Sequence, residues 1–325
     1  MNVVGPERLR KLHPVAAGDS LPVGVPVRQV MRAWDIEPVR IARIGGSRNV
    51  HWAVSAPEGR FVLRCYRQDR DAEAIDYEFR VLAHLRQAGW PVACPLPTLA
   101  TWKERLFALF PALPGRQRPI PTRPAYARER GALLAVLHSD LDRLPLGQRS
   151  NWRSTDEFMA AEAGEIVANA MARLGDHPHL REPIVRITEK TYATLDCLPV
   201  DLPRCIVHGD FVAWNLRWRD GYLSALLDFD DARLDLRAMD VAAARRRDTD
   251  EVVAGYLAVQ HLDDLEIALL APLWRAYTLL FVADLLQAPA LTNTVMRSLE
   301  WCAQEIQTTQ PAAVPRTAAI QRGAS

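Results

Sequence analysis

The sequence has no excess of charge of either sign. Its 40 Lys and Arg residues are balanced by 39 Asp and Glu residues, which leaves a formal net charge of +1 over 325 residues. Nucleic acids and anionic membrane surfaces are bound largely through clustered basic charge. We therefore expect no nucleic acid and no membrane among the partners of this protein.

Cysteine is also scarce. The five cysteines are scattered along the chain and form neither a CxxC pair nor a spacing typical of zinc ligands. The N-terminal segment carries charges from Glu7 through Lys11 and has no apolar core of signal-peptide length. Both features favour a cytoplasmic protein with reduced thiols.

Uninterrupted hydrophobic runs of membrane-spanning length are missing as well. The most apolar stretch, Ile267 to Leu291, is interrupted by Pro272, Arg275 and Asp284, which favours one or more buried helices over a membrane span. No G-x-x-x-x-G-K-[ST] segment is present, which excludes a P-loop nucleotide site at the level of motifs. With 49% hydrophobic residues, the chain is expected to form an ordinary packed core.

Short apolar runs separated by glycine dominate the first third of the chain. Between Val39 and Tyr66 they predict three antiparallel strands joined by turns. From Asp71 to Ala88 apolar residues recur at helical spacing, and Gly89 is placed as a stop signal. Two further strand candidates follow, the second of which is RLFALFPALPG.

These patterns predict an α+β fold. Residues 26–115 should form a small lobe with an antiparallel sheet and one helix, and residues 116–307 a larger, mostly helical lobe. The proline-rich segment RQRPIPTRP is the predicted boundary, and residues 1–25 and 308–325 are expected to be flexible ends. Helices are expected over residues 126–141, 155–174 and 180–198 and from 238 to about 307.

The most informative segment is IVHGDFVAWNLRW, which is followed by GYLSALLDFDDAR. It contains the pattern H-G-D-x4-N, with Asp210 and Asn215, and then D-F-D, with Asp228 and Asp230. A tight loop and a hairpin would bring two acidic groups and an amide together. Phosphoryl transfer needs a carboxylate to accept the proton of an attacking hydroxyl, and oxygen ligands to hold magnesium. Asp210 suits the first task, Asn215 and Asp228 the second, and Asp230 is a further candidate ligand.

The order and spacing of these residues resemble the catalytic loop and metal segment of protein kinases. The HGD version resembles the aminoglycoside phosphotransferase and choline kinase superfamily, which includes homoserine, choline and antibiotic kinases. The segments GGSRN, FVLR, LFPALPG and LLAVLH resemble, in turn, the nucleotide-covering turn, third strand, interlobe hinge and pre-catalytic helix of that family. The resemblance covers roughly Ile41 to Ala244.

The resemblance implies a protein-kinase-like fold of two lobes and a role for each matching residue. Asp210 would be the catalytic base, and Asp240 a structural aspartate. Arg64 stands where the family commonly has a phosphate-anchoring lysine, a substitution that changes reach and geometry. The implied nucleotide-site residues are Gly45, Gly46, Ser47, Asn49, Arg64, Glu78, Phe110 and Leu113, and the implied metal ligands are Asn215, Asp228 and Asp230.

The function that we infer from the sequence is transfer of the γ-phosphoryl group of ATP or GTP, with Mg²⁺, to a hydroxyl group of a small molecule. An amino alcohol, a sugar or an antibiotic would each fit as acceptor, and the oligomeric state is left open. One alternative is a kinase-like regulatory protein that binds nucleotide with weak or no activity, motivated by Arg64. Another is a metal-dependent phosphohydrolase, which is disfavoured because histidine-rich ligand sets are missing.

Several other residues have ordinary structural interpretations that we prefer. Gly45 and Gly46 permit a hairpin turn whether or not they cover a phosphate, and His208 is expected to order its loop. The run Arg245 to Arg247 would offer a site for an anionic substrate, but we expect it to face solvent, as most charge runs on helices do. The helix face of Trp274, Tyr277 and Phe281 is expected to be core, although an open face would line an acceptor site. The acidic residues that a polycationic acceptor would need are expected to be surface charges: Asp248, Asp250, Glu251, Asp263, Asp264 and Glu266.

Overall fold

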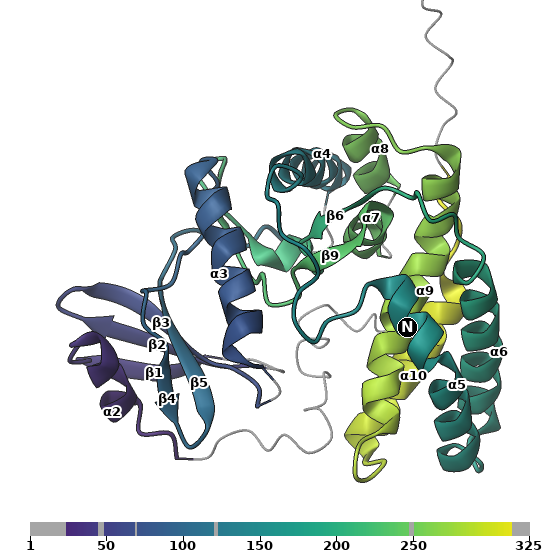
Figure 1. Ribbon diagram of the computed structural model, residues 1–325, viewed down its shortest axis with the longest axis horizontal. Helices are drawn as coiled ribbons and strands as arrows, with labels where there is room; N and C mark the ends of the chain where they lie inside the picture. The colour runs from purple at the N-terminus through teal and green to yellow at the C-terminus, as the bar shows by residue number, and fades with distance from the viewer. Residues whose placement is uncertain (1–23, 45–48, 69, 120–122, 247–249, 314–325) are drawn as a thin grey trace, which may run out of the picture.

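The computed structural model describes residues 24–44, 49–68, 70–119, 123–246 and 250–313. It confirms the predicted α+β class. A twisted sheet with helix α3 across it forms one end of the molecule, and a group of helices forms the other (Figure 1). We call residues 24–115 the sheet lobe and residues 116–313 the helical lobe.

The sheet has five antiparallel strands in the order β1-β2-β3-β5-β4. The three strands predicted between Val39 and Tyr66 are confirmed as its first three members. Successive side chains of a strand point to opposite faces. The register places His51 opposite Arg64 and Trp52 opposite Leu63, so these two pairs lie on different faces. The strands are β1 Arg40–Ile44, β2 Val50–Ala56, β3 Gly59–Cys65, β4 Ala100–Trp102 and β5 Arg105–Pro111.

Each face of the sheet packs against a different layer. Phe110 and Ala108 join the large core that continues into the helical lobe. Trp52 and Leu63 join a smaller core beneath the short helices α2 (Val27–Met31) and η1 (Arg32–Trp34). Sequence analysis missed α2, because five residues are too few to show helical periodicity.

Helix α3 (Ala72–Gln87) confirms the helix predicted after the third strand. The Asp71 carboxylate caps its first turn by accepting the backbone N–H of Ala74 at 2.6 Å. Gly89 follows its end with a φ of +91°, in the left-handed region that glycine adopts easily. The helix crosses the sheet and buries Glu78 against it.

The helical lobe confirms the helices predicted after residue 125. Its helices are α4 Pro124–Leu141, α5 Thr155–Arg173, α6 Pro178–Leu195, α7 Arg237–Arg245, α8 Glu251–Leu257, α9 Asp264–Leu286 and α10 Asn293–Thr308. Helix α9 runs unbroken through Pro272 and packs against α5, α6, α7 and α10. By length and composition it is the one helix of the described residues that could cross a membrane, but 61% of its apolar window is buried inside the lobe.

Two short antiparallel pairs interrupt the helices. Strand β6 (Arg204–Val207) pairs with β9 (Arg233–Leu236), and β7 (Leu216–Arg219) with β8 (Tyr222–Leu226), with η2 (Ala213–Asn215) before β7. We did not predict β9, because its sequence RLDL shows charged rather than apolar residues. Arg233 and Asp235 are nevertheless buried as an ion pair at 2.6 Å. Because β6 precedes the H-G-D loop and β9 follows the D-F-D segment, their pairing brings these two segments together.

The chain remains packed for a few residues past α10. Arg245 donates to the carbonyl oxygens of Gln310 and Pro311, and the Ala313 N–H donates to Asp250. The segment expected to be a flexible tail from residue 308 is therefore held against Arg245 of α7 and against Asp250 as far as residue 313.

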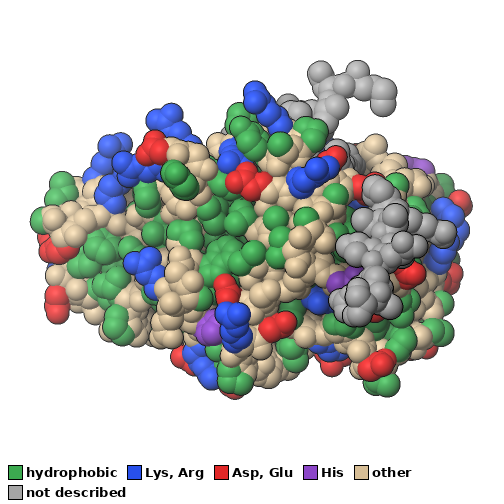
Figure 2. All heavy atoms as spheres, turned by 90° about the horizontal axis from the view of Figure 1, so that it is seen from above, with side chains coloured by type: hydrophobic (Ala, Val, Ile, Leu, Met, Phe, Trp, Pro, Cys, Tyr) green, Lys and Arg blue, Asp and Glu red, His purple; other side chains and the backbone are tan. Residues whose placement is uncertain are grey.

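On the face shown in Figure 2, basic and acidic side chains lie scattered among apolar ones.

Candidate active site

The buried carboxylate of Asp240 anchors the H-G-D loop by accepting hydrogen bonds from its backbone. Asp240, on α7, accepts the backbone N–H groups of His208 at 2.7 Å and Gly209 at 3.0 Å, and His138 Nε2 donates to it at 3.1 Å. Burial opposes ionisation of Asp240, but the hydrogen bonds and charges of His138 and His208 outweigh it and lower its pKa. An ionised, fully occupied carboxylate therefore fixes the start of the loop.

Gly209 lets the loop approach the D-F-D segment closely. Its φ is +80°, and a Cβ added there would lie 2.5 Å from the carbonyl oxygen of Asp231. Such a contact is shorter than any van der Waals separation, so only glycine fits.

His208 links the loop to the end of β8. Its Nδ1 accepts the Asp210 N–H at 3.2 Å, so Nε2 carries the proton and donates to the Leu227 carbonyl at 3.1 Å. Complete burial lowers the pKa of His208, which keeps the ring neutral. This arrangement agrees with the loop-ordering role expected from the sequence.

Asp210 and Asn215 are hydrogen-bonded to each other. The Asn215 Nδ2 group donates to the Asp210 carbonyl oxygen and to its Oδ2, both at 2.9 Å. The amide nitrogen is thus committed to Asp210, which leaves Asn215 Oδ1 without a donor among the described residues. An amide oxygen in this position can accept a hard cation.

Asp228 is the most accessible acid of the D-F-D segment, with 48% of its side chain exposed. Its φ of +69° is rare for a residue with a side chain, which is typical of a constrained functional loop. Desolvation, followed by repulsion from Asp230, Asp210 and Asp231, raises the pKa of Asp228 to about 7 against the opposing charge of Arg64. Burial and the neighbouring carboxylates thus both disfavour the charge of Asp228, and a divalent cation beside it would offset that cost.

Asn215 and Asp228 fit a magnesium ion, since Asn215 Oδ1 has no donor among the described residues and Asp228 presents a half-exposed carboxylate. Among the residues that the structure describes, no three His, Cys, Asp or Glu side chains gather in metal-binding geometry. A metal at this place would thus take most of its ligands from phosphate oxygens and water.

Asp230 has a different environment from Asp228. It is buried, and its Oδ2 lies 3.4 Å from Arg70 Nη2. Its backbone carbonyl accepts Nη1 of Arg149 at 2.7 Å. The role of metal ligand that the sequence predicts for Asp230 stays a prediction.

Arg149 joins the two lobes beneath the site, and sequence analysis missed it. Its Nε donates to the Ala74 carbonyl of α3 at 2.8 Å, while Nη1 donates to the carbonyls of Asp230 and Ala232 at 2.7 and 3.0 Å. Burial lowers the pKa of Arg149, although the Asp230 and Glu78 charges oppose this. No local pattern marks an isolated loop arginine for such a role.

Arg64 lies where the sheet, α3 and the D-F-D segment meet. Its Nη1 donates to Glu78 Oε1 at 2.7 Å, its Nε to His51 Nε2 at 3.1 Å, and its Nη2 lies 3.6 Å from Asp228. Burial lowers the pKa of Arg64, but the charge of Glu78 more than compensates and raises it. The Tyr66 hydroxyl donates to the second Glu78 oxygen at 3.1 Å, so both oxygens of that carboxylate are used.

The segment after β5 connects the lobes. Phe110 is buried in β5, with its ring 4.9 Å from the Arg64 guanidinium. The backbone N–H of Leu113, just beyond β5, has no hydrogen-bond partner among the described residues. Gly115 packs so closely against the β7–β8 hairpin that an added Cβ would lie 2.1 Å from Ser224 Oγ. These contacts hold the connecting segment in place.

The predicted nucleotide-covering turn is only partly described. Gly45, Gly46 and Ser47 lie outside the described residues. Asn49 is buried at the start of β2, where its Oδ1 accepts the Arg67 N–H at 3.2 Å. The side chain of Asn49 thus serves a contact within the sheet lobe.

The expectation that Arg245 and Arg246 face solvent is wrong. Arg245 is buried and donates to Asp250 at 2.9 Å. Arg246 donates from Nη2 to Asp210 Oδ1 at 2.7 Å, and its guanidinium lies over the Trp214 ring. A charge run on a helix usually faces water, but here α7 ends against the H-G-D loop, which sequence spacing does not show. Arg247 lies outside the described residues.

The aromatic face of α9 is largely core, as expected. Trp274 and Tyr277 are buried and stacked with ring centroids 5.5 Å apart, and Phe281 packs edge-on at 5.2 Å from Tyr277. The rim of this face reaches the site, because the Arg246 guanidinium lies 5.4 Å from the Trp274 ring.

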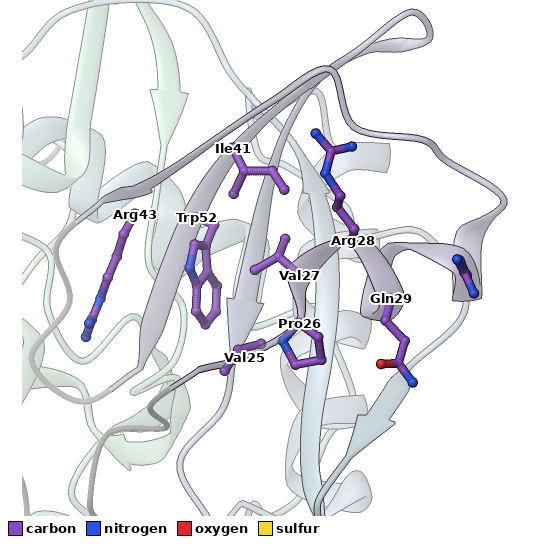
Figure 3. A pocket seen from close by; sticks show the side chains of 9 residues that line it. Val25, Pro26, Val27, Arg28, Gln29, Ile41, Arg43 and Trp52 are labelled. Atoms are coloured by element: carbon purple, nitrogen blue, oxygen red, sulfur yellow. The ribbon is translucent and has the colours of Figure 1, made fainter.

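A separate pocket of about 660 Å³ lies on the face of the sheet that does not carry Arg64. Figure 3 shows α2 residues such as Val27 and Gln29 beside Ile41 and Trp52 of the sheet. Strand alternation puts Trp52 on the face opposite Arg64. None of its lining residues is among the predicted site residues, so we do not assign the nucleotide to this pocket.

Comparison with known proteins finds phosphotransferases both by family model and by similarity of sequence. The model of the phosphotransferase enzyme family matches residues 40–280. A homoserine kinase of Phenylobacterium zucineum (strain HLK1) is 27% identical over 258 residues, which cover 73% of this chain and 76% of that protein.

Solved structures share the fold. The amicoumacin kinase hAmiN, in complex with AMP-PNP, Ca²⁺ and Ami, matches with a TM-score of 0.68 and 14% identity, covering 95% of this chain and 97% of its own. A microcompartment-associated aminopropanol kinase matches with a TM-score of 0.60 and 18% identity, covering 86% and 94%. The predicted protein-kinase-like fold of two lobes is thereby confirmed.

Proposed function

This chain belongs to the phosphotransferase enzyme family, and from that premise we propose that it transfers the γ-phosphoryl group of ATP, bound with Mg²⁺, to a hydroxyl group of a small molecule. The observation that carries the proposal is the joint placement of Asp210, Asn215 and Asp228. Asn215 orients Asp210 through two hydrogen bonds, while Asp228 presents a carboxylate whose charge is disfavoured by burial and by the acidic groups around it.

Asp210 acts as the base in this proposal. Its Oδ2 is fixed by the Asn215 amide, and its carboxylate accepts the proton of the acceptor hydroxyl. The acceptor oxygen forms a bond to the γ-phosphorus, and the bond from that phosphorus to the leaving nucleoside diphosphate breaks. Asp210 then releases the proton to solvent.

The remaining site residues bind and position the donor. The Arg64 guanidinium, held by Glu78, supplies positive charge for the phosphates. The Leu113 N–H supplies a hydrogen-bond donor for the base, and Asn215 and Asp228 supply oxygen ligands for the metal. Bound magnesium would offset negative charge on the phosphates during transfer.

The test is a coupled ATP-consumption screen against amino alcohols, hydroxy amino acids, sugars and aminoglycosides, with Asp210→Ala as the control. We expect Mg-dependent turnover of at least one acceptor, and a loss of about 10²- to 10⁴-fold in the variant with nucleotide binding retained. A folded protein that binds no Mg-nucleotide would refute the proposal.

Two other results would point to the alternatives. Nucleotide binding without turnover across the whole panel would favour the regulatory interpretation. ATP hydrolysis that is independent of any acceptor would favour a phosphohydrolase.

A further inference from the structure

Arg246 is held in an unusual backbone conformation beside the proposed base. Its φ is +43° and its ψ is −129°, a combination that is unfavourable for any residue with a side chain. Such a conformation persists only where surrounding contacts impose it. Here the side chain contacts Asp210 of the H-G-D loop, Trp214 of η2 and Trp274 of α9.

The guanidinium of Arg246 is fixed in place, but only part of its hydrogen-bonding capacity is satisfied by described residues. Nη2 makes its one hydrogen bond to described residues, to Asp210 Oδ1 at 2.7 Å, and the buried Nε has no described partner. An arginine has five N–H donors in a planar fork that matches a carboxylate. The indole ring of Trp214 lies 4.4 Å from the guanidinium carbon, which restrains the plane of that fork. Arg246 is thus well placed to bind an anion that has two oxygens.

The acidic residues that a polycationic acceptor would need are engaged elsewhere. Asp250 accepts from Arg245, Glu251 from Arg128, and Glu266 from Arg237. Asp263 caps the first turn of α9, while Asp264 is exposed beside it and Asp248 lies outside the described residues. The charged side chain that contacts the base is that of Arg246, whose Nη2 donates to Asp210 Oδ1.

We propose that Arg246 binds a carboxylate of the acceptor, so that the preferred acceptors are hydroxy acids, in particular amino acids that carry a hydroxyl. The inference rests on the proposed function. In the free protein Arg246 donates a hydrogen bond to Asp210 Oδ1. The acceptor hydroxyl would approach this same oxygen if Arg246 did not cover it. A carboxylate that binds the guanidinium replaces this ion pair, and Asp210 becomes accessible to the hydroxyl of the same molecule.

This exchange discriminates between acceptors. An amino alcohol without a carboxylate has to break the pair of Arg246 and Asp210 and gives the guanidinium no new partner. Losing one partner of a desolvated charge pair is costly, whereas exchanging one carboxylate for another is not. Arg246, which restrains the base, thus also determines the preference for acceptors that carry a carboxylate.

The experiment compares kcat/KM for matched acceptors. Homoserine, threonine and serine are each paired with the amino alcohol that lacks only the carboxylate, which for serine is ethanolamine. The variants are Arg246→Met, Arg246→Lys and, as a charge-matched control, Arg219→Met, whose arginine is exposed on β7. Circular dichroism and melting curves establish that each variant is folded.

We expect the wild type and Arg219→Met to prefer the carboxylate-bearing member of at least one pair. Arg246→Met should reduce that preference about tenfold to a hundredfold, mainly through KM, and Arg246→Lys should restore part of it. Because Arg246 also contacts the base, the test uses the ratio of kcat/KM between the two members of a pair and not either value alone.

The inference is overturned if Arg246→Met lowers kcat/KM by the same factor for both members of a pair. It is also overturned if the wild type has the higher kcat/KM with the amino alcohols. It is also overturned if none of the six molecules is phosphorylated while another hydroxyl compound is, in which case the proposed function stands. Absence of Mg-nucleotide binding would instead remove the proposed function itself.

Discussion

Arg64 Nη2 and Asp228 Oδ1 lie 3.6 Å apart, although the first residue belongs to the sheet lobe and the second to the helical lobe. The same guanidinium donates to Glu78 on α3 at 2.7 Å. One buried cation therefore links β3, α3 and the D-F-D segment, and the two lobes meet at the charged groups of the candidate site.

Glu78→Gln should destabilise the protein and weaken nucleotide binding. It leaves the buried Arg64 without its closest counter-charge, and breaking such a pair costs about 3–5 kcal/mol. Denaturant unfolding and the KM for ATP measure the two effects. Asp76→Asn, on the exposed side of the same helix, should stay within about 0.5 kcal/mol of the wild type. Equal stability of the two variants would contradict the role of the pair.

Asp228→Asn should raise the magnesium concentration needed for half-maximal activity by at least about tenfold, because a charged oxygen ligand becomes neutral. Titration of activity with MgCl₂ at saturating ATP measures this. Asp220→Asn, at the exposed β7–β8 turn, provides the control. An unchanged magnesium requirement in Asp228→Asn would mean that this carboxylate does not hold the metal.

His208→Gln should make stability less sensitive to mild acid. Burial lowers the pKa of His208, so below about pH 6.5 the unfolded chain takes up a proton that the folded chain does not. His208 therefore contributes a loss of stability as pH falls below that value, by up to about 1.4 kcal/mol per pH unit. Glutamine can still donate to the Leu227 carbonyl but does not titrate.

Unfolding free energies at pH 7.5 and pH 5.5 test this prediction, with the exposed His179→Gln as control. The difference between the two pH values should be smaller in His208→Gln than in the wild type and unchanged in the control. Equal differences in all three proteins would show that His208 is protonated in the folded state.

Gly131→Ala should destabilise the contact between α4 and α8. A Cβ at Gly131 would lie 1.9 Å from the Val252 carbonyl oxygen, and one at Gly255 would lie 1.9 Å from that of Arg128. Separating the helices should cost about 1–3 kcal/mol or more. Gly164→Ala, on α5 with nothing within 4 Å of the new Cβ, should be neutral or stabilising by up to about 1 kcal/mol. Thermal and denaturant unfolding of the two variants measure the contrast.

Much of the fold and the core of the site could be predicted because their signals are local. The strands between Val39 and Tyr66 and helix α3 follow from hydrophobic periodicity and glycine placement, which depend only on neighbouring residues. Asp210 and Asn215 were recognisable because a single tight loop joins them. Strand β9 was missed because its Arg233 and Asp235 read as polar, although they are buried as a pair.

The sequence by itself determined the first three strands, helix α3, the loop that carries Asp210 and the two-lobed architecture. Only the tertiary structure decided that Arg149 joins α3 to the D-F-D segment, that Asp230 faces Arg70, and that Arg246 restrains Asp210. The physical reason is distance along the chain. Helical and strand patterns are imposed by backbone geometry over a few residues, whereas a buried arginine chooses its partner from whatever packing brings within hydrogen-bond reach.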